Sequence, residues 1–301
     1  MWRLEYNLCC TRQTVWPMSD TECRRLADPD AGRGQIFITD RRDRIAVWRM
    51  NLPRKLNCLN AAMLASMRSA FAMAADDPTV DAAVLTGTGR YFSSGAAFGD
   101  VGLISAKTVL RPAALHAAVA ELNIGIFHPF IHFPKPLFIA ANGPAVGGAT
   151  TMQLLCDAVL CLPDATFHTP FRQLGITPEG CSTFTFARKM GLEGARRMLV
   201  EGEKLSSAEA ARLGFVDVVV EEGGAEDLVC QACQFAERWV SEGRGRWIVE
   251  EGLVETLDAT NRREALHLAD SMFSVEFWRA SGVPSWVAWL LLPVMQRLAK
   301  L

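Results

Sequence analysis

Two apolar runs of strand length, each followed by a turn of small residues, constrain the fold of this chain most. "VDAAVLTG" (80–87) precedes the turn "FSSGAAFGD" (92–100), and "PLFIAAN" (136–142) precedes "NGPAVGGATT" (142–151). Apolar runs without polar alternation are typical of strands that are covered on both faces of a sheet. A long helical pattern from about Thr108 to Phe127 separates the two runs, so the sequence predicts an α/β core.

The flanking segments extend this order of elements. "QIFITD" and "RIAVWRMN" enclose the polar turn "RRDR" and predict a β-hairpin, after which Asn60 is expected to cap a helix through about Ala75. Residues 152–156 continue as helix, and "AVLCL" and "ATFHT" predict short strands. Beyond Val220 the pattern is almost wholly helical. We therefore expect a poorly ordered N-terminal extension (1–34), an α/β core (35–222) and a helical C-terminal region (223–301).

Charge and cysteine content exclude several classes of protein. Thirty-one basic and thirty-three acidic residues give a net charge of −2, which argues against nucleic acid as the main partner. The nine cysteines are scattered through apolar segments, so we expect reduced thiols in an intracellular protein. Cys230 and Cys233 form one C-x-x-C pair in a helical pattern with no histidine nearby, which favours core packing over zinc. We expect no metal site.

The apolar runs are too short for a membrane span. None reaches the roughly 18 to 20 residues that a bilayer requires. The longest, "VPSWVAWLLLPVM" (283–295), is interrupted by Pro293 and indicates a packed terminal helix or an interface. The first 34 residues lack the apolar core of a secretory signal.

The two small-residue turns have the chemistry of a ligand site. Small residues let a ligand approach the backbone and leave N–H groups free to donate. Neither turn fits G-x-G-x-x-G or G-x-x-x-x-G-K-[ST], so dinucleotide and P-loop sites are excluded. Close packing of helix on strand remains an alternative explanation of the small residues.

A single carboxylate stands out in "QLGITPEGCST" (173–183). Glu179 lies between Pro178 and Gly180, and everything close to it in sequence is apolar, small or hydroxylated. A solvated acid in a Pro-Gly turn is one interpretation, and a functional acid is the other. An apolar pocket would raise the pKa of Glu179, whereas a helix starting near Cys181 would lower it. The sequence leaves the balance open.

Four segments together resemble the enoyl-CoA hydratase/isomerase (crotonase) superfamily. They are "NLPRKLNCLN", "AVLTGTGRYFSSGAAF", "KPLFIAANGPAVGGATTMQLLCDAVL" and "ATFHTPFRQLGITPEGCST", and the resemblance covers about residues 35–220. It implies a crotonase-like spiral of ββα turns with a helical C-terminal region, assembled as trimers or pairs of trimers. It also implies an acyl-CoA substrate, with coenzyme A as part of that substrate and no separate cofactor.

The resemblance also implies the residues of the site. The thioester oxygen is expected between the backbone N–H groups of Ala96 and Gly148, because two preorganised donors stabilise the charge that develops there. Many relatives carry Asp where this chain has Ala97, but a backbone donor does not require that side chain. The substrate-binding residues that the resemblance implies are Lys55, Leu56, Ser94, Gly95, Ala96, Ala97, Phe98, Gly147, Gly148 and Phe171.

The acids that are present favour isomerisation. Hydratases of this family use two glutamates, at the positions that here hold Thr151 and Phe171, and neither replacement can carry a proton. "HTPFRQLGITPEGCSTFTF" resembles the peroxisomal Δ3,Δ2-enoyl-CoA isomerases, in which the glutamate of "PEG" is the proposed base. Glu179 is therefore predicted to be the catalytic base. Hydration, thioester hydrolysis and a non-catalytic acyl-CoA-binding role remain alternatives.

Other residues allow further interpretations. A Cys181 nucleophile with His168 as its base lacks an orienting acid, so a packed thiol is favoured. Lys55 is expected either to contact the phosphates of coenzyme A or to be a solvated loop lysine. The C-terminal "AKL" has the pattern of import signals of the S-K-L type, which predicts recognition by the peroxisomal import receptor and a peroxisomal or glycosomal location.

Overall fold

The computed structural model describes residues 35–96, 112–272, 274, 276 and 277. The chain divides into two compact units, Met1–Gly34 and Gln35–Leu301, and all described residues belong to the second. Ala97, Phe98, the segment 283–295 and the terminal "AKL" lie outside the described residues, as does the N-terminal extension.

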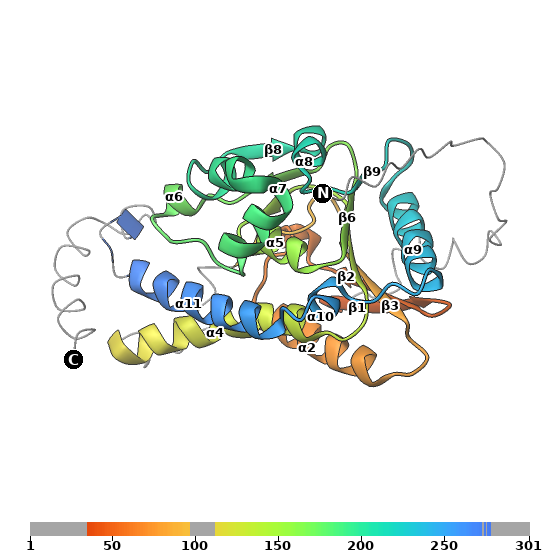
Figure 1. The fold of residues 1–301 in the computed structure, drawn as a ribbon, viewed down its shortest axis with the longest axis horizontal. Coiled ribbons are helices and arrows are strands. Elements are labelled where there is room, and N and C mark those ends of the chain that lie inside the picture. The colour runs from red at the N-terminus through yellow and green to blue at the C-terminus, as the bar shows by residue number, and fades with distance from the viewer. Residues whose placement is uncertain (1–34, 97–111, 273, 275, 278–301) are drawn as a thin grey trace. The chain divides into compact units, whose positions relative to one another are not determined.

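Two sheets form the strand framework (Figure 1). The larger has the order β1-β2-β3-β4-β6-β9, with the hairpin β1/β2 antiparallel and the other pairs parallel. The smaller has the order β5-β7-β8. The strands are β1 (Phe37–Arg42), β2 (Ile45–Met50), β3 (Ala82–Gly87), β4 (Leu137–Ala141), β5 (Ala145–Val146), β6 (Ala158–Cys161), β7 (Thr166–His168), β8 (Lys204–Ser206) and β9 (Val218–Val219).

Helices follow most of the strands, as the sequence predicts. The α-helices are α2 (Ala61–Asp76), α4 (Pro112–His132), α5 (Gly148–Thr151), α6 (Phe171–Leu174), α7 (Ser182–Leu199), α8 (Ser207–Leu213), α9 (Ala225–Ser241), α10 (Trp247–Glu250) and α11 (Val254–Ser271). The described 3-10 helices are η1 (Pro53–Lys55) and η3 (Met152–Leu155). Asn60 caps α2 by accepting from the backbone N–H of Met63 at 2.9 Å, so the predicted cap is confirmed.

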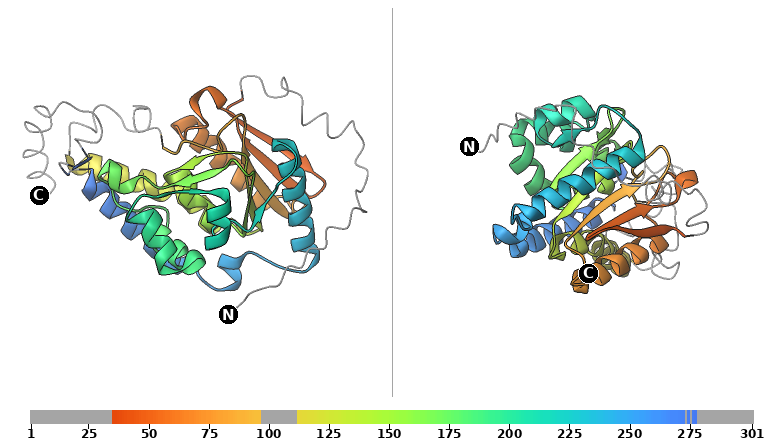
Figure 2. Two further views of the ribbon diagram at one scale, coloured as in Figure 1. Left: turned by 90° about the horizontal axis from the view of Figure 1, so that it is seen from above. Right: turned by 90° about the vertical axis from the view of Figure 1, so that its right-hand side faces the viewer.

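The apolar runs are buried on both faces of the larger sheet. In β3, Ala83 and Leu85 belong to one core cluster, whereas Ala82 and Val84 belong to the cluster on the other face. Side chains that alternate between two cores leave no polar face on the strand, which explains the run "AAVL". Helix α9 covers the second face (Figure 2), so the helical region beyond residue 222 shares a core with the strands.

Helices α4 and α11 lie side by side and antiparallel (Figure 1). His116 near the start of α4 contacts Asp270 near the end of α11, and His132 at the end of α4 contacts Asp258 near the start of α11. Helix α4 extends past the predicted end at Phe127 to His132 and contains Pro129. The burial of Phe130 and Ile131 offsets the backbone hydrogen bond that the proline lacks.

Helix α4 also has the length and composition of a membrane-crossing helix over Ala113–His132, as judged among the described residues. This contrasts with the expectation that no apolar run is long enough. Length and apolarity alone are weak evidence for a span, because a core helix of a globular domain passes the same test. Of this window, 39% is buried inside the structure, where apolar side chains of α4 pack in the core and against α11.

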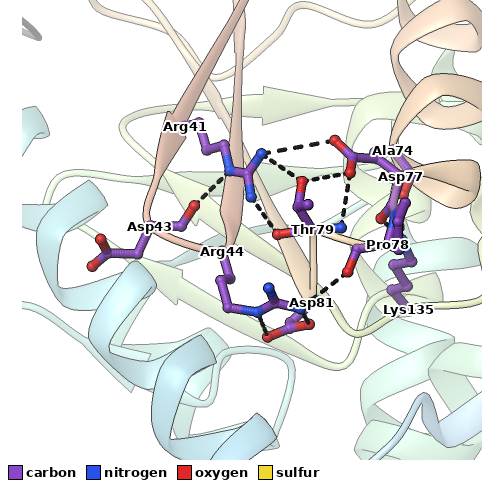
Figure 3. Close-up of polar contacts among 9 residues, drawn as sticks. All are labelled: Arg41, Asp43, Arg44, Ala74, Asp77, Pro78, Thr79, Asp81 and Lys135. Carbon is purple, nitrogen blue, oxygen red and sulfur yellow. Dashed lines mark hydrogen bonds and ion pairs between the residues drawn. The ribbon is translucent and has the colours of Figure 1, made fainter.

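Paired charges join the elements at the edge of the sheet where β2, β3 and β4 begin (Figure 3). Arg44 donates to Asp81 Oδ1 at 2.7 Å and to the carbonyl oxygen of Pro78 at 3.0 Å. Arg41 donates to Thr79 Oγ1 at 2.8 Å, and Lys135 donates to the carbonyl oxygen of Asp77 at 2.6 Å. The contacts of Arg41 and Arg44 hold the β1/β2 hairpin against the loop between α2 and β3, and Lys135 attaches the chain before β4 to the same loop. The small-residue turns follow β3 and β4 and therefore lie at the opposite edge.

Candidate active site

Glu179 is buried in the loop between α6 and α7, with only 6% of the residue exposed. Asn123 of α4 donates from Nδ2 to Glu179 Oε2. The other carboxylate oxygen faces the second small-residue turn, because a Cβ atom placed on Gly148 would lie 3.0 Å from Glu179 Oε1. The interpretation of Glu179 as a solvated turn acid is therefore wrong.

The environment of Glu179 makes it a stronger base than an ordinary glutamate. The pKa of Glu179 is raised to about 7, and burial is the largest cause. The hydrogen bond from Asn123 lowers this pKa, and the negative charge of Glu264 makes a smaller contribution that raises it. The balance that the sequence left open thus falls on the side of the apolar pocket. At neutral pH such a carboxylate is partly ionised, which suits a group that accepts and returns a proton.

The Pro-Glu-Gly turn is fixed by tight packing around Gly180. This residue has φ of +70°, and a Cβ atom on it would lie 2.5 Å from Thr151 Oγ1 and 2.6 Å from Phe127 Cε1. Only glycine fits both the conformation and the space. The side chain of Glu179 therefore leaves a backbone with little freedom to move.

The two small-residue turns lie against each other. The backbone N–H of Val146 donates to Ser93 O at 3.0 Å, and a Cβ atom on Gly95 would lie 2.4 Å from Val146 O. Gly95 has φ of +81°, so a larger residue there is excluded by both conformation and space. This contact brings Gly95 beside the segment Val146–Gly147, with Ala96 and Gly148 next along the chain.

The backbone N–H groups of Ala96 and Gly148 have no hydrogen-bond acceptor within the part of the chain that the structure describes. Gly148 is the first residue of α5, where an N–H has no partner inside the helix. Ala96 forms a parallel bridge with Leu59 in which Leu59 N–H donates to Gly95 O, so the N–H of Ala96 points away from Leu59. Both groups keep their donor capacity.

The other residues predicted for the site lie in two places, the loop around η1 and the hydrophobic core. Leu56 O accepts from Ser94 N at 2.8 Å, which attaches the loop after η1 to the first small-residue turn. Lys55 is exposed in η1. Phe171 is only 1% exposed and belongs to the main core cluster. Thr151, also buried, donates to Gly148 O at 3.2 Å.

The cysteine alternative has no geometric support. Cys181 is fully buried and donates from Sγ to Leu257 O, and burial raises its pKa above the usual range. His168 instead contacts the carbonyl oxygen of Gly202. Among the described residues, no group of three or more His, Cys, Asp or Glu side chains could hold a metal ion.

Sequence reasoning missed Asn57, Asn123 and Glu264. Buried Asn57 donates to Tyr91 O at 2.8 Å and accepts from Leu52 N at 2.9 Å, so it joins η1 to the chain before the first turn. Asn123 and Glu264 belong to α4 and α11, far from Glu179 in sequence. Their one signal is a polar residue on the buried face of a helix.

The chain belongs to the enoyl-CoA hydratase/isomerase family, whose model matches residues 40–283. It is 38% identical over 185 residues to human "Enoyl-CoA delta isomerase 2", covering 62% of this chain and 46% of that protein. It is also 38% identical over 210 residues to mouse "Enoyl-CoA delta isomerase 3, peroxisomal", covering 68% and 63%. The chain thus spans about half to two thirds of the length of these relatives.

Other relatives and solved structures support the fold and show varied chemistry. "4-chlorobenzoyl coenzyme A dehalogenase-2" of Arthrobacter sp is 30% identical over 232 residues, covering 76% of this chain and 83% of that protein. An enoyl-CoA hydratase/isomerase structure from Pseudoalteromonas atlantica T6c superposes with a TM-score of 0.70 at 24% identity, covering 82% and 95%. At that identity the likeness shows the fold, which confirms the predicted crotonase-like architecture.

Proposed function

We propose that this protein is a Δ3,Δ2-enoyl-CoA isomerase, which moves the double bond of a 3-enoyl-CoA to give a 2-trans-enoyl-CoA. The observation that carries the proposal is the buried carboxylate of Glu179, with Oε1 facing Gly148 and Oε2 held by Asn123. The two positions where hydratases of the family carry glutamates hold Thr151 and Phe171 instead. The isomerase names of the two relatives at 38% identity agree with this assignment.

The reaction needs one proton carrier. Glu179 accepts the proton from C2, the electron pair of that C–H bond forms the C2–C3 double bond, and the former C3–C4 pair takes up a proton at C4. Between the two steps the negative charge is delocalised onto the thioester oxygen. Glu179 then returns the proton to C4, so atoms and electrons balance without an oxidant or a second acid.

The backbone donors have a separate role. The N–H groups of Ala96 and Gly148 are proposed to hold the thioester oxygen, and each such donor is typically worth a hundred- to thousand-fold in rate. The coenzyme A portion is proposed to extend past Leu56 and Ser94, with Lys55 near its phosphates. We propose no cofactor beyond the coenzyme A of the substrate.

Hydration is the main competing reaction, since relatives of this chain have varied chemistry. It requires a second group to position and activate water. Among the described residues, a second buried carboxylate near Glu179 is Glu264, and one of its oxygens accepts from Thr183 N at 2.9 Å. Because Thr151 and Phe171 stand at the two positions where hydratases of the family carry glutamates, the residues present support isomerisation over hydration.

One assay separates the candidate functions. Purified protein is incubated in parallel with 3-enoyl-CoA and 2-enoyl-CoA, and the products are separated by chromatography. The proposal requires 2-trans-enoyl-CoA from the first substrate. A 3-hydroxyacyl-CoA as main product indicates a hydratase, free coenzyme A indicates a thioesterase, and binding without turnover indicates a non-catalytic acyl-CoA-binding protein.

The location proposed for this activity is the peroxisome or a related organelle such as the glycosome. The mouse relative carries "peroxisomal" in its name, and the chain ends in "AKL". Deletion of Leu301 is expected to leave the protein in the cytosol with its activity unchanged, because the import receptor reads the terminal tripeptide. Unchanged organellar location would exclude this signal. A trimer or a pair of trimers remains a prediction that sedimentation would test.

A further inference from the structure

The amino end of α7, close to Glu179, is capped from another helix. Cys181 occupies the cap position with φ of +61° and supplies no side-chain cap. Thr183 instead donates to Glu264 Oε1 of α11 from both its backbone N–H, at 2.9 Å, and its hydroxyl. The N–H groups of Ser182 and Phe184 donate to the carbonyl oxygens of Glu179 and Cys181. The first-turn donors of α7 are therefore occupied without the carboxylate of Glu179.

Glu264 is itself an unusual residue to bury. It is 2% exposed, and its Oε2 has no hydrogen-bond partner among the described residues. Three further polar atoms on α4, α7 and α11 are also buried without a partner among the described residues. They are Asn123 Oδ1, Ser182 Oγ and Asn261 Oδ1. An unsatisfied buried carboxylate oxygen is destabilising, so packing alone does not account for this choice of residue.

Few charged groups act on the pair Glu179 and Glu264. Burial raises the pKa of Glu264. The Thr183 hydrogen bonds, the backbone N–H of Cys181 and the positive charge of Arg263 oppose that rise. Cys181 stays a thiol because burial raises its pKa, and the negative charges of Glu264 and Asp258 raise it further. On the side of α4, Glu179 meets the neutral amide of Asn123. Among these groups, the negative charge of Glu264 is the one that raises the pKa of Glu179.

We propose that Glu264 is a positioning residue for the catalytic base Glu179. The carboxylate of Glu264 occupies the positive end of α7, and its negative charge opposes the ionisation of Glu179. This inference rests on the proposed function of Glu179. Without Glu264, two effects act in the same direction. The like charge is lost, and the positive end of α7 is left without an anion other than Glu179. Both make the ionised form of Glu179 more favourable and therefore weaken it as a base.

The test is the Glu264→Gln variant. Glutamine keeps an oxygen for Thr183 and removes the charge. We expect the acid limb of the kcat–pH profile to move to lower pH by about 0.5 to 1 unit, and the plateau kcat to fall by no more than about tenfold. Glu255→Gln is the matched control, because Glu255 is an exposed glutamate on the same helix. It is expected to leave the limb in place.

Thr183→Val serves as a milder variant if Glu264→Gln does not fold. It removes one of the two donors to Glu264, so Glu264 takes up a proton at higher pH and repels Glu179 less across the acid range. The limb is expected to move in the same direction by a smaller amount. An acid limb that stays in place, or moves to higher pH, in the folded variants would overturn the inference.

A direct titration separates this inference from the proposed function. Carboxyl 13C NMR of protein labelled at glutamate, assigned with Glu179→Gln, reports the pKa of Glu179 whichever reaction the enzyme performs. A wild-type protein without isomerase activity would contradict the proposed function alone. An unchanged Glu179 titration in Glu264→Gln would contradict the inference alone.

Discussion

At the edge of the sheet where β2, β3 and β4 begin, Arg44 and Asp81 pair in partial contact with solvent, with 53% and 31% of their side chains exposed (Figure 3). At the opposite edge, beyond the ends of β3 and β4, the residue Glu179 is 6% exposed and no cation pairs with it among the described residues. The first region lowers the pKa of its acid through the Arg44 hydrogen bonds, and the second raises the pKa of its acid through burial.

The comparison distinguishes paired charges, which hold elements together, from a buried carboxylate, which can transfer a proton. An exposed pair remains ionised over the whole neutral range and contributes little to stability, because water and salt screen it. A buried, unpaired carboxylate destabilises the fold whenever it is ionised, but it is only partly ionised at neutral pH and can accept a proton from a substrate and return it. Replacing a carboxylate with its amide should therefore have different consequences in the two regions.

The largest effect is expected from Glu179→Gln. The amide keeps the size of the side chain and removes the proton acceptor. We therefore expect kcat to fall by at least about a hundredfold, and by as much as about ten-thousand-fold, while acyl-CoA affinity changes little. Steady-state kinetics with 3-enoyl-CoA, together with calorimetric titration of an unreactive acyl-CoA, measure the two quantities separately.

Asp81→Asn is the matched control at the other edge, since it also replaces a carboxylate with its amide. Its kcat should equal that of the wild-type protein. If Glu179→Gln keeps more than about a tenth of wild-type kcat, the base must be sought elsewhere. If Asp81→Asn loses activity, the two edges are coupled and the comparison fails.

The fold could be predicted to a large extent because its signals are local. The hairpin follows from β-branched residues around a polar turn, and in the structure Arg42 pairs with Ile45 across Asp43–Arg44. The cap at Asn60 and the buried strands β3 and β4 follow from short segments in the same way. The end of α4 was missed because the burial of Phe130 and Ile131, a tertiary effect, overrides the local signal of Pro129.

The site was predictable only where its residues lie in motifs. Glu179 and the two turns stand in recognisable segments, and the structure brings Gly95 against Val146 and Glu179 against Gly148. Asn123 lies 56 residues from Glu179, and Glu264 lies 81 residues from Thr183. Their contacts depend on how α4, α7 and α11 pack, which local periodicity does not specify. The pKa of Glu179 depends on the same packing.

Glu179 also lowers the free energy of unfolding when its side chain is ionised. Its pKa in the folded protein is about 7 against an ordinary value of 4.5, so the folded state binds the proton more tightly than the unfolded state. The free energy of unfolding therefore falls as pH rises from 4.5 to 7 and stays low above that range. At pH 8, Glu179→Gln should be more stable than wild type by as much as about 3 kcal/mol.

Urea denaturation of both proteins at pH 4.5 and pH 8 checks this prediction. The difference between them should be small at pH 4.5, where both side chains are neutral, and large at pH 8. A gain of equal size at both pH values would show that the substitution improves packing and that no charge is buried. A loss of stability at pH 8 would show that Glu179 has a cationic partner.

The smallest effect is expected from breaking the exposed pair. Arg44→Ala removes two hydrogen bonds to Asp81 and one to Pro78 O, but water replaces these contacts at an exposed site. The thermal midpoint should fall by about 2 °C or less, and kcat and the Glu179 acid limb should not change. Thermal unfolding monitored by circular dichroism measures the first quantity.

A double-mutant cycle isolates the pair from the rest of the cluster in that last test. Arg44→Ala and Asp81→Ala, made singly and together at low and at 1 M salt, report the coupling between the two side chains. Because a salt solution of that concentration screens exposed charges over a few ångströms, the coupling should shrink toward zero as salt is added. The acid limb that reports Glu179 should stay in place over the same range, since its pKa depends on burial. A coupling that persists in salt would mean that Arg44 and Asp81 are shielded from water. The two edges would then differ only in that Asp81 has a cationic partner and Glu179 has none among the described residues.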